Sequence, residues 1–242
     1  MSKFAALVRR ELGVYFVSPT AYIILTALLF ISGWVFHSSV ESFVSNRLPS
    51  DYQPTLLFIE VVIVLTSALV TMRLVAEEKS RGTLEILLTS PVTEAQVVLG
   101  KFLATLVFLA FILLPTVGFA IILARYGSVD FGQVFCGYLG VMLLGAAIYS
   151  IGLFISSLCM SQITAGMITF SLVILLVIAN LRSMNLPENS FWRQLLEWVN
   201  LGTVFGDFMK GVIDLGRLVY LVSISGFFLF LTTRILETRR WR

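Results

Sequence analysis

The feature that most constrains this chain is a run of 51 residues, 131–181, that contains no charged side chain. A helix crosses the roughly 30 Å core of a bilayer in about 20 residues, so the run is too long for one membrane span and suits two. Its polar pairs Ser156-Ser157 and Ser161-Gln162 provide a turn between them. The whole chain has the same character, with 58% hydrophobic and 13% charged residues, against about 25% charged in a soluble protein. The sequence therefore predicts a polytopic membrane protein.

Charged residues divide the rest of the chain into further apolar blocks, and six spans are expected in total. Their predicted ranges are 22–37, 56–75, 102–124, 131–156, 163–181 and 218–236. Pro115 should bend the third span. The first apolar run is too long for the core of a signal peptide, so we expect it to be retained. The predicted fold class is all-α, with six transmembrane helices in a single domain, 1–242.

The distribution of basic residues predicts the orientation. Six spans place both termini on one side of the membrane. The segments on that side carry 11 of the 17 Lys and Arg residues, and those on the other side carry six. Basic residues concentrate in cytoplasmic loops. Both termini are therefore expected in the cytoplasm, with the chain in the inner (plasma) membrane, among membrane lipids. The net charge of +3 then reflects orientation and gives no reason to expect a nucleic-acid partner.

Two connecting segments are predicted to lie along the membrane surface. Residues 1–18 have apolar side chains at helical spacing, which indicates an interfacial amphipathic helix that Ser18-Pro19 ends. The alternative is a simple topogenic anchor. The outer segment, 182–217, has two amphipathic stretches, and Gly202 and Gly206 would allow a reversal between them. We expect a pair of short helices at the outer surface or dipping into it.

The cytoplasmic loop 76–91 is the densest charge cluster, and it also carries leucines. Thr83 can cap a short helix that presents Leu84, Leu87 and Leu88 on one apolar face and ends before Pro91. A short amphipathic helix between two spans suits docking against a soluble partner. A solvated loop is the alternative, but it needs no apolar stripe. The candidate docking residues are Glu77, Glu78, Arg81, Gly82, Thr83, Leu84, Glu85, Leu87 and Leu88.

Sequence patterns of enzymes and of metal sites are lacking. There is no GxxxxGK[ST] motif for ATP, no CxxC, and a single histidine, His37. Cys136 and Cys159 lie in apolar sequence and are expected to be free thiols. Glu60 is a candidate intramembrane polar site, although a carboxylate near the outer headgroups is more often simply hydrated. We expect no metal and no cofactor bound by this chain.

The loop motif resembles that of a known family. The pattern EExxxGTLExLLxSP from Glu77 to Pro91, followed by Gly100-Lys101 before the third span, is similar to the permease subunit of type-2 ABC exporters, the ABC-2 type. The resemblance covers essentially the whole chain. Asn200-Leu201-Gly202 and the later FMKGVID stretch resemble the gliding-motility-associated subgroup.

This resemblance implies functional roles for the predicted segments. Residues 1–18 would be the elbow helix, 77–90 the coupling helix that sits in a groove of a cytoplasmic ATPase, and 182–217 a re-entrant outer hairpin. Two permeases, identical or different, would work with two ABC ATPase subunits, which bind the ATP and magnesium. Arg81 and Glu85 would make polar contacts with the ATPase, and Leu84 and Leu87 would fill its groove.

Three functions follow as hypotheses. The first is a non-enzymatic permease subunit that moves an amphipathic or lipid-linked substrate, which suits the scarcity of charge within the spans. The second is a structural anchor or assembly subunit of a cell-envelope or motility complex that transports nothing. The third, an intramembrane enzyme using His37 and Glu60, is disfavoured because no catalytic constellation accompanies them.

Overall fold

The computed structural model describes residues 3–46, 52–83, 93–126, 129–184 and 201–240. Within these ranges the regular elements are helices, and none is a strand. The α-helices are α1 (Lys3–Val17), α2 (Pro19–Asn46), α3 (Gln53–Thr71), α4 (Ala76–Ser80), α6 (Glu94–Leu113), α7 (Val117–Tyr126), α8 (Phe131–Leu158), α9 (Gln162–Met184), α11 (Leu201–Met209) and α12 (Leu215–Arg240). A 3₁₀ turn, Leu114–Thr116, joins α6 to α7.

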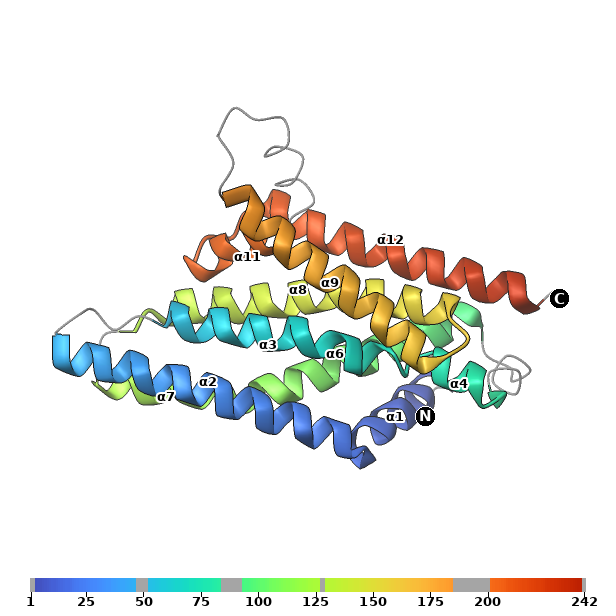
Figure 1. The fold of residues 1–242 in the computed structure, drawn as a ribbon, viewed down its shortest axis with the longest axis horizontal. Coiled ribbons are helices and arrows are strands. Elements are labelled where there is room, and N and C mark those ends of the chain that lie inside the picture. Colours follow the sequence, from blue (N-terminus) through green and yellow to red (C-terminus); the bar gives the residue numbers. More distant parts are fainter. Residues whose placement is uncertain (1–2, 47–51, 84–92, 127–128, 185–200, 241–242) are drawn as a thin grey trace.

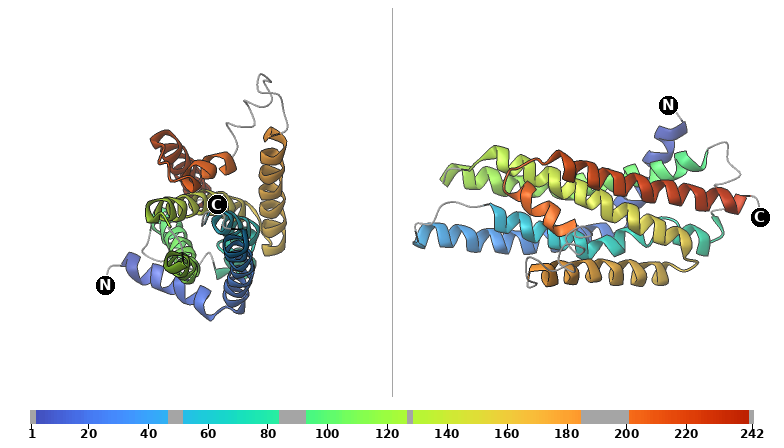
Figure 2. Two further views of the ribbon diagram at one scale, coloured as in Figure 1. Left: turned by 90° about the vertical axis from the view of Figure 1, so that its left-hand side faces the viewer. Right: turned by 90° about the horizontal axis from the view of Figure 1, so that it is seen from above.

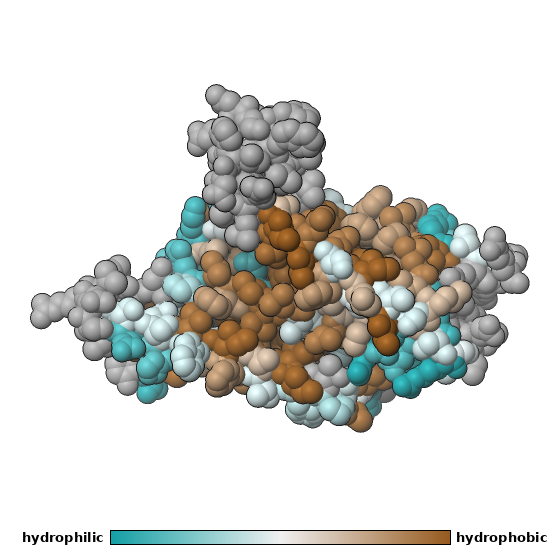
Figure 3. All heavy atoms as spheres, viewed as in Figure 1, coloured by the Kyte–Doolittle hydropathy of each residue, from teal (hydrophilic) through white to brown (hydrophobic). Residues whose placement is uncertain are grey.

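Six of the described helical segments are long and apolar enough to cross a membrane. They form one elongated bundle in which α9 crosses α3 and α8 at a clear tilt and the others run roughly along the long direction (Figure 1 and Figure 2). Apolar side chains form a broad belt around the middle of the face shown in Figure 3, and hydrophilic side chains gather at its two ends. The predicted fold class, an all-α polytopic membrane protein, is confirmed. The start of α1 and the end of α12 lie toward the end of the bundle that carries α4 (Figure 1).

Helix α8 is the centre of the bundle. It packs against α3, α6, α9, α11 and α12 and is buried along most of its length. Glycines on α8 allow this close packing. A Cβ atom added at Gly152 would lie 2.6 Å from Cβ of Thr71 on α3, and one at Gly140 would lie 2.6 Å from Cβ of Phe208 on α11. The neighbouring helices therefore sit closer to α8 than a larger residue would permit.

Several helix boundaries differ from the predicted span limits because a helix continues beyond its apolar part. Helix α2 extends well past His37, and the hydroxyls of Ser38 and Ser39 donate to the carbonyl of Val35 within it. Helix α6 begins eight residues before the predicted third span, at a capping box in which Thr93 and Gln96 bond reciprocally. Hydropathy marks the lipid-crossing part of a helix and not its ends.

The interruption expected at Pro115 is present as the 3₁₀ turn between α6 and α7. A buried group of hydroxyls surrounds this turn. The Tyr52 hydroxyl donates to the Thr116 carbonyl oxygen at 3.0 Å. The Tyr138 hydroxyl lies 2.9 Å from that of Tyr52 and 2.8 Å from Oγ1 of Thr116. These bonds hold α3, the turn and α8 together toward the end of the bundle away from α4.

The predicted reversal at Gly202 and Gly206 is wrong. Both glycines lie inside α11, because Phe205 and Phe208 are fully buried against the bundle and hold this segment as one helix. A turn follows this helix at Gly211, whose φ of +80° favours glycine. The first of the two predicted outer helices falls in 185–200 and lies outside the described residues.

Candidate functional site at the α4 end of the bundle

Helix α4 follows α3 after a short turn and is fixed to the end of α8 by side chains. The Ser156 hydroxyl accepts hydrogen bonds from the backbone N–H groups of Val75 and Ala76, at 3.1 and 3.0 Å, and donates to the Met72 carbonyl at 3.4 Å. It thereby satisfies N–H groups that the start of a helix leaves without partners. Lys79 also donates to the carbonyl of Ser157. The position of α4 is therefore tied to that of α8.

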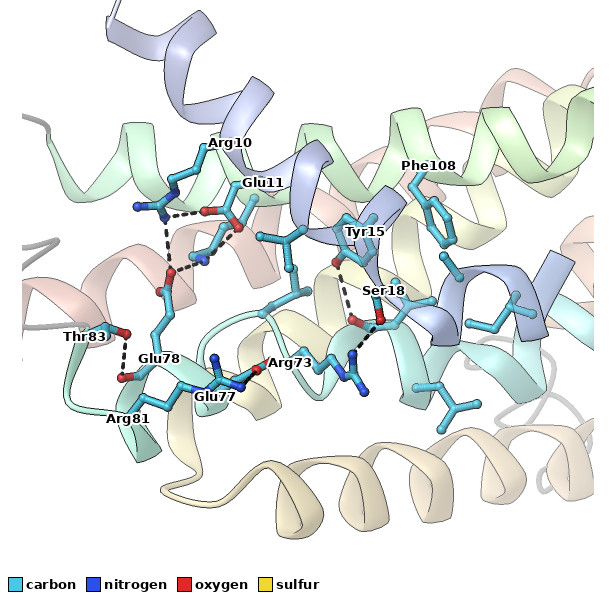
Figure 4. A pocket seen from close by; sticks show the side chains of 17 residues that line it. Arg10, Glu11, Tyr15, Ser18, Arg73, Glu77, Glu78, Arg81, Thr83 and Phe108 are labelled. Carbon is cyan, nitrogen blue, oxygen red and sulfur yellow. Dashed lines mark hydrogen bonds and ion pairs between the residues drawn. The ribbon is translucent and has the colours of Figure 1, made fainter.

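A charge cluster that is buried at Lys101 and Glu11 and half exposed at Arg10 connects α4 with α1 and α6 (Figure 4). Lys101 of α6 has a side chain only 2% exposed, and its Nζ lies 3.1 Å from Oε2 of Glu11 and 2.9 Å from Oε1 of Glu78. Arg10 contacts the same two carboxylates, at 2.5 and 3.3 Å. We call Arg10, Glu11, Glu78 and Lys101 the Lys101 cluster. It pairs two cations with two anions, as burial of charge requires.

The pKa of Glu11 reports the strength of these contacts. Burial alone would raise the pKa of this carboxyl, because a charged group loses hydration inside the protein. The positive charge of Lys101 and the hydrogen bond from Arg10 outweigh that effect and hold the pKa below its ordinary value. Glu11 is therefore ionised at neutral pH. One oxygen of Glu78, Oε2, is buried and has no hydrogen-bond partner among the described residues.

The outer side of α4 is more exposed. Arg81 lies 2.7 Å from Glu77 in an i,i+4 ion pair, and its side chain is 70% exposed. Gly82 has a φ of +70°, which lets the chain turn away after α4. The Thr83 hydroxyl then donates to the Glu78 carbonyl at 3.3 Å. This side of α4 is available to a partner.

A cavity of about 250 Å³ lies beside the Lys101 cluster, among α1, α2, α3 and α6. One part of its lining is charged, with residues of the cluster and of α4. The other part is apolar and includes Tyr15 and Phe108, whose rings stack with centroids 4.9 Å apart. Figure 4 shows Arg73 between these two parts, bonded to Ser18. The cavity is thus amphipathic.

The structure brings some of the predicted docking residues together. Glu77 and Glu78 lie on α4, and Arg81, Gly82 and Thr83 follow it directly. The remaining four, Leu84, Glu85, Leu87 and Leu88, lie outside the described residues.

Glu60 does not belong to this site. It is half-buried on α3, eleven residues or about 17 Å before the end of that helix.

Sequence reasoning did not place Glu11 or Lys101 among the docking residues. Lys101 reads as a charge that limits a span, yet it is buried within α6. A signal for Glu11 does exist, because Leu7, Glu11 and Tyr15 follow one another at intervals of four residues and share one face of α1. An acidic residue in that apolar stripe needs a buried cation.

The described residues contain no group of three or more His, Cys, Asp or Glu side chains that could hold a metal ion. Cys136 is buried on α8, and Cys159 is half-buried just after it. Both are free thiols.

Comparison with known protein families gives a match along nearly the whole chain. The family model described as "ABC-2 family transporter protein" matches residues 13–235, from α1 into α12. No curated protein matches the chain significantly. The matched range includes Glu78 and Lys101 as well as α4.

Proposed function

Because the chain belongs to the ABC-2 family of transporter proteins and is a membrane permease component of an ABC transporter, we propose that it couples to separate cytoplasmic ATPase subunits through α4 and the segment that follows. ATP and magnesium bind to those subunits, and this chain contributes no catalytic residue. The narrower resemblance to the gliding-motility subgroup stays a prediction.

The observation that carries this proposal is the attachment of α4 to the bundle. The Lys101 cluster joins α4 to α1 and α6, and Ser156 joins it to α8. A partner that pushes α4 therefore displaces three other helices with it. Rigid-body rocking of packed helices is a common means of switching between two states. The exposed Arg81, next to the leucine-bearing segment, provides the contact surface.

The scarcity of charge in the spans supports an amphipathic or lipid-linked substrate. Glu60 is the carboxylate that intrudes most into an apolar helix, whereas ion-coupled transporters keep several ionisable groups near the midplane. Two copies of the permease, or this chain with a related one, form the path. The excess of Lys and Arg at the α4 end supports cytoplasmic termini for a chain in the inner membrane.

The test is to co-express the full chain with an ABC ATPase subunit encoded in the same genome. We expect Arg81→Glu, and the pair Leu84→Asp and Leu87→Asp, to abolish co-purification and the permease-dependent part of ATP hydrolysis. Arg9→Glu is the matched control, because Arg9 is exposed on α1 and does not line the cavity. Unchanged complex and unchanged hydrolysis in the Arg81 and leucine variants would refute docking through this surface. ATP-dependent transport in reconstituted vesicles separates a permease from an anchor subunit, which would show none.

A further inference from the structure

We propose that the amphipathic cavity among α1, α2, α3 and α6 binds an anionic phospholipid of the adjacent leaflet, with Arg73 holding its phosphate. This inference goes beyond the transport function and does not depend on it, because bound lipid is measured without an ATPase or a transported substrate.

The charges around the cavity single out Arg73. The cavity is lined by four cations. Arg10 and Lys101 are paired within the Lys101 cluster, and Arg81 is paired with Glu77. Arg73 makes no ion pair with a carboxylate among the described residues. The lining thus has one cation whose charge is not balanced by a described partner.

The hydrogen bonds of Arg73 are also incomplete. Its Nη1 donates to Oγ of Ser18 at 2.8 Å. Its Nε is buried and has no hydrogen-bond partner among the described residues. A buried donor without a partner is unfavourable, and most such groups in proteins are satisfied. A guanidinium presents its donors as a planar fork that matches two phosphate oxygens. A phosphate would therefore accept the hydrogen bond that Nε lacks.

The apolar part of the cavity favours a lipid over free phosphate. Ala21 and Ile24 of α2 are buried in its wall, whereas Val14 and Leu69 are 56% and 41% exposed at its margin. Binding of an inorganic ion would bury none of this apolar surface. The wall can cover the first part of an acyl chain, and the exposed Val14 and Leu69 continue the apolar surface beyond the cavity. The volume of about 250 Å³ suits a headgroup and part of a chain.

The position along the membrane normal is that of lipid headgroups. Ser18 lies between α1 and α2, where the chain turns from the interfacial helix into the first span. Arg73 lies two residues after the end of α3. Ser18 lies three residues before the first candidate span, which begins at Ala21, and Arg73 ends the uncharged run 61–72 of the second. Basic side chains at this level attract anionic lipids.

The experiment measures lipid bound to the purified full chain in detergent by native mass spectrometry. The probes are phosphatidylglycerol, phosphatidylcholine and inorganic phosphate, each added separately. We expect wild type to bind phosphatidylglycerol at least tenfold more tightly than phosphatidylcholine. Arg73→Gln should weaken phosphatidylglycerol binding at least tenfold, and Arg73→Lys by less. Arg9→Gln, the same change of charge on exposed α1, should alter it less than twofold.

Three results would overturn the proposal. Wild type could show no preference for the anionic lipid. Arg9→Gln could weaken binding as much as Arg73→Gln does, which would indicate general surface charge. Phosphate alone could bind in an Arg73-dependent way while the lipid does not, which would indicate a site for a free ion. If Arg73→Gln does not fold, a photoreactive phosphatidylglycerol on wild type gives the answer. Cross-links at Val14 or Leu69 support the site, and cross-links found only elsewhere refute it.

Discussion

Substitution of Lys101 by Met tests whether the Lys101 cluster holds α4 in place. The Lys101 side chain is 2% exposed, and its Nζ lies within 3.1 Å of a carboxylate oxygen of both Glu11 and Glu78. Met keeps most of the side-chain length but removes the charge. The substitution leaves the Glu11 carboxylate, itself only 8% exposed, without its buried cation.

Removal of one partner from a buried ion pair destabilises proteins by about 3–5 kcal/mol. We expect about 3 kcal/mol for Lys101→Met, the lower end of that range, because Arg10 still contacts both carboxylates. Adding Glu11→Gln removes the unbalanced charge. The double variant should therefore recover roughly half of the loss, since replacing both members of a buried pair is often close to neutral.

The assay is equilibrium unfolding of the purified full chain in mixed micelles, followed by circular dichroism. The control is Arg81→Gln, which breaks the exposed pair with Glu77 and should cost less than about 1 kcal/mol. A Lys101→Met protein as stable as the control would show that the cluster contributes little. A double variant less stable than Lys101→Met would show that the loss comes from packing and not from the unpaired carboxylate.

Three further predictions concern other contacts. The lowered pKa of Glu11 stabilises the fold fully above its ordinary pKa of about 4.5, so this contribution should be lost as the pH falls below that value, and less stability should be lost in Glu11→Gln. Gly152→Ala should lower the free energy of unfolding by about 1–3 kcal/mol, because the new methyl group overlaps Thr71 and pushes α3 away from α8. Tyr138→Phe should lower the free energy of unfolding by about 1 kcal/mol, because it removes a hydroxyl that lies within hydrogen-bond distance of Tyr52 and Thr116 at the 3₁₀ turn.

Each of these has its own measurement and contrary result. The first is checked by the drop in unfolding midpoint from pH 7 to pH 4. An equal drop in wild type and in Glu11→Gln would contradict the role of the lowered pKa. The control for Gly152 is Gly226→Ala, where an added Cβ meets nothing within 4 Å; equal effects of the two alanines on thermal unfolding would refute the close approach. For Tyr138, an unchanged unfolding transition would mean that the two remaining hydroxyls re-pair.

Hydropathy and charge predicted the spans because lipid imposes one simple requirement on each residue in turn. The 51-residue run became α8 and α9, joined at 159–161, next to the polar pairs that predicted the turn. Pro115 interrupts α6 and α7 because its ring cannot continue the hydrogen-bond ladder. These inferences need only local sequence.

The Lys101 cluster could not be predicted in the same way. Glu11 and Lys101 are 90 residues apart, and their ion pair depends on how α1 lies across α6. A rule that treats each charge as the end of a span assigns Lys101 to the boundary. The error at Gly202 and Gly206 has a similar origin, because the helix there is held by Phe205 and Phe208 packing against α8. Tertiary contacts decided both cases.

The Ser156 hydroxyl bonds to three backbone groups at the junction of α3 and α4. Because one side-chain oxygen makes all three bonds, Ser156→Ala would remove all of them at once. The N–H groups of Val75 and Ala76 would lose this acceptor, whereas the bond from Lys79 to the Ser157 carbonyl would remain. A single atom of α8 thus makes three of the contacts that hold the start of α4.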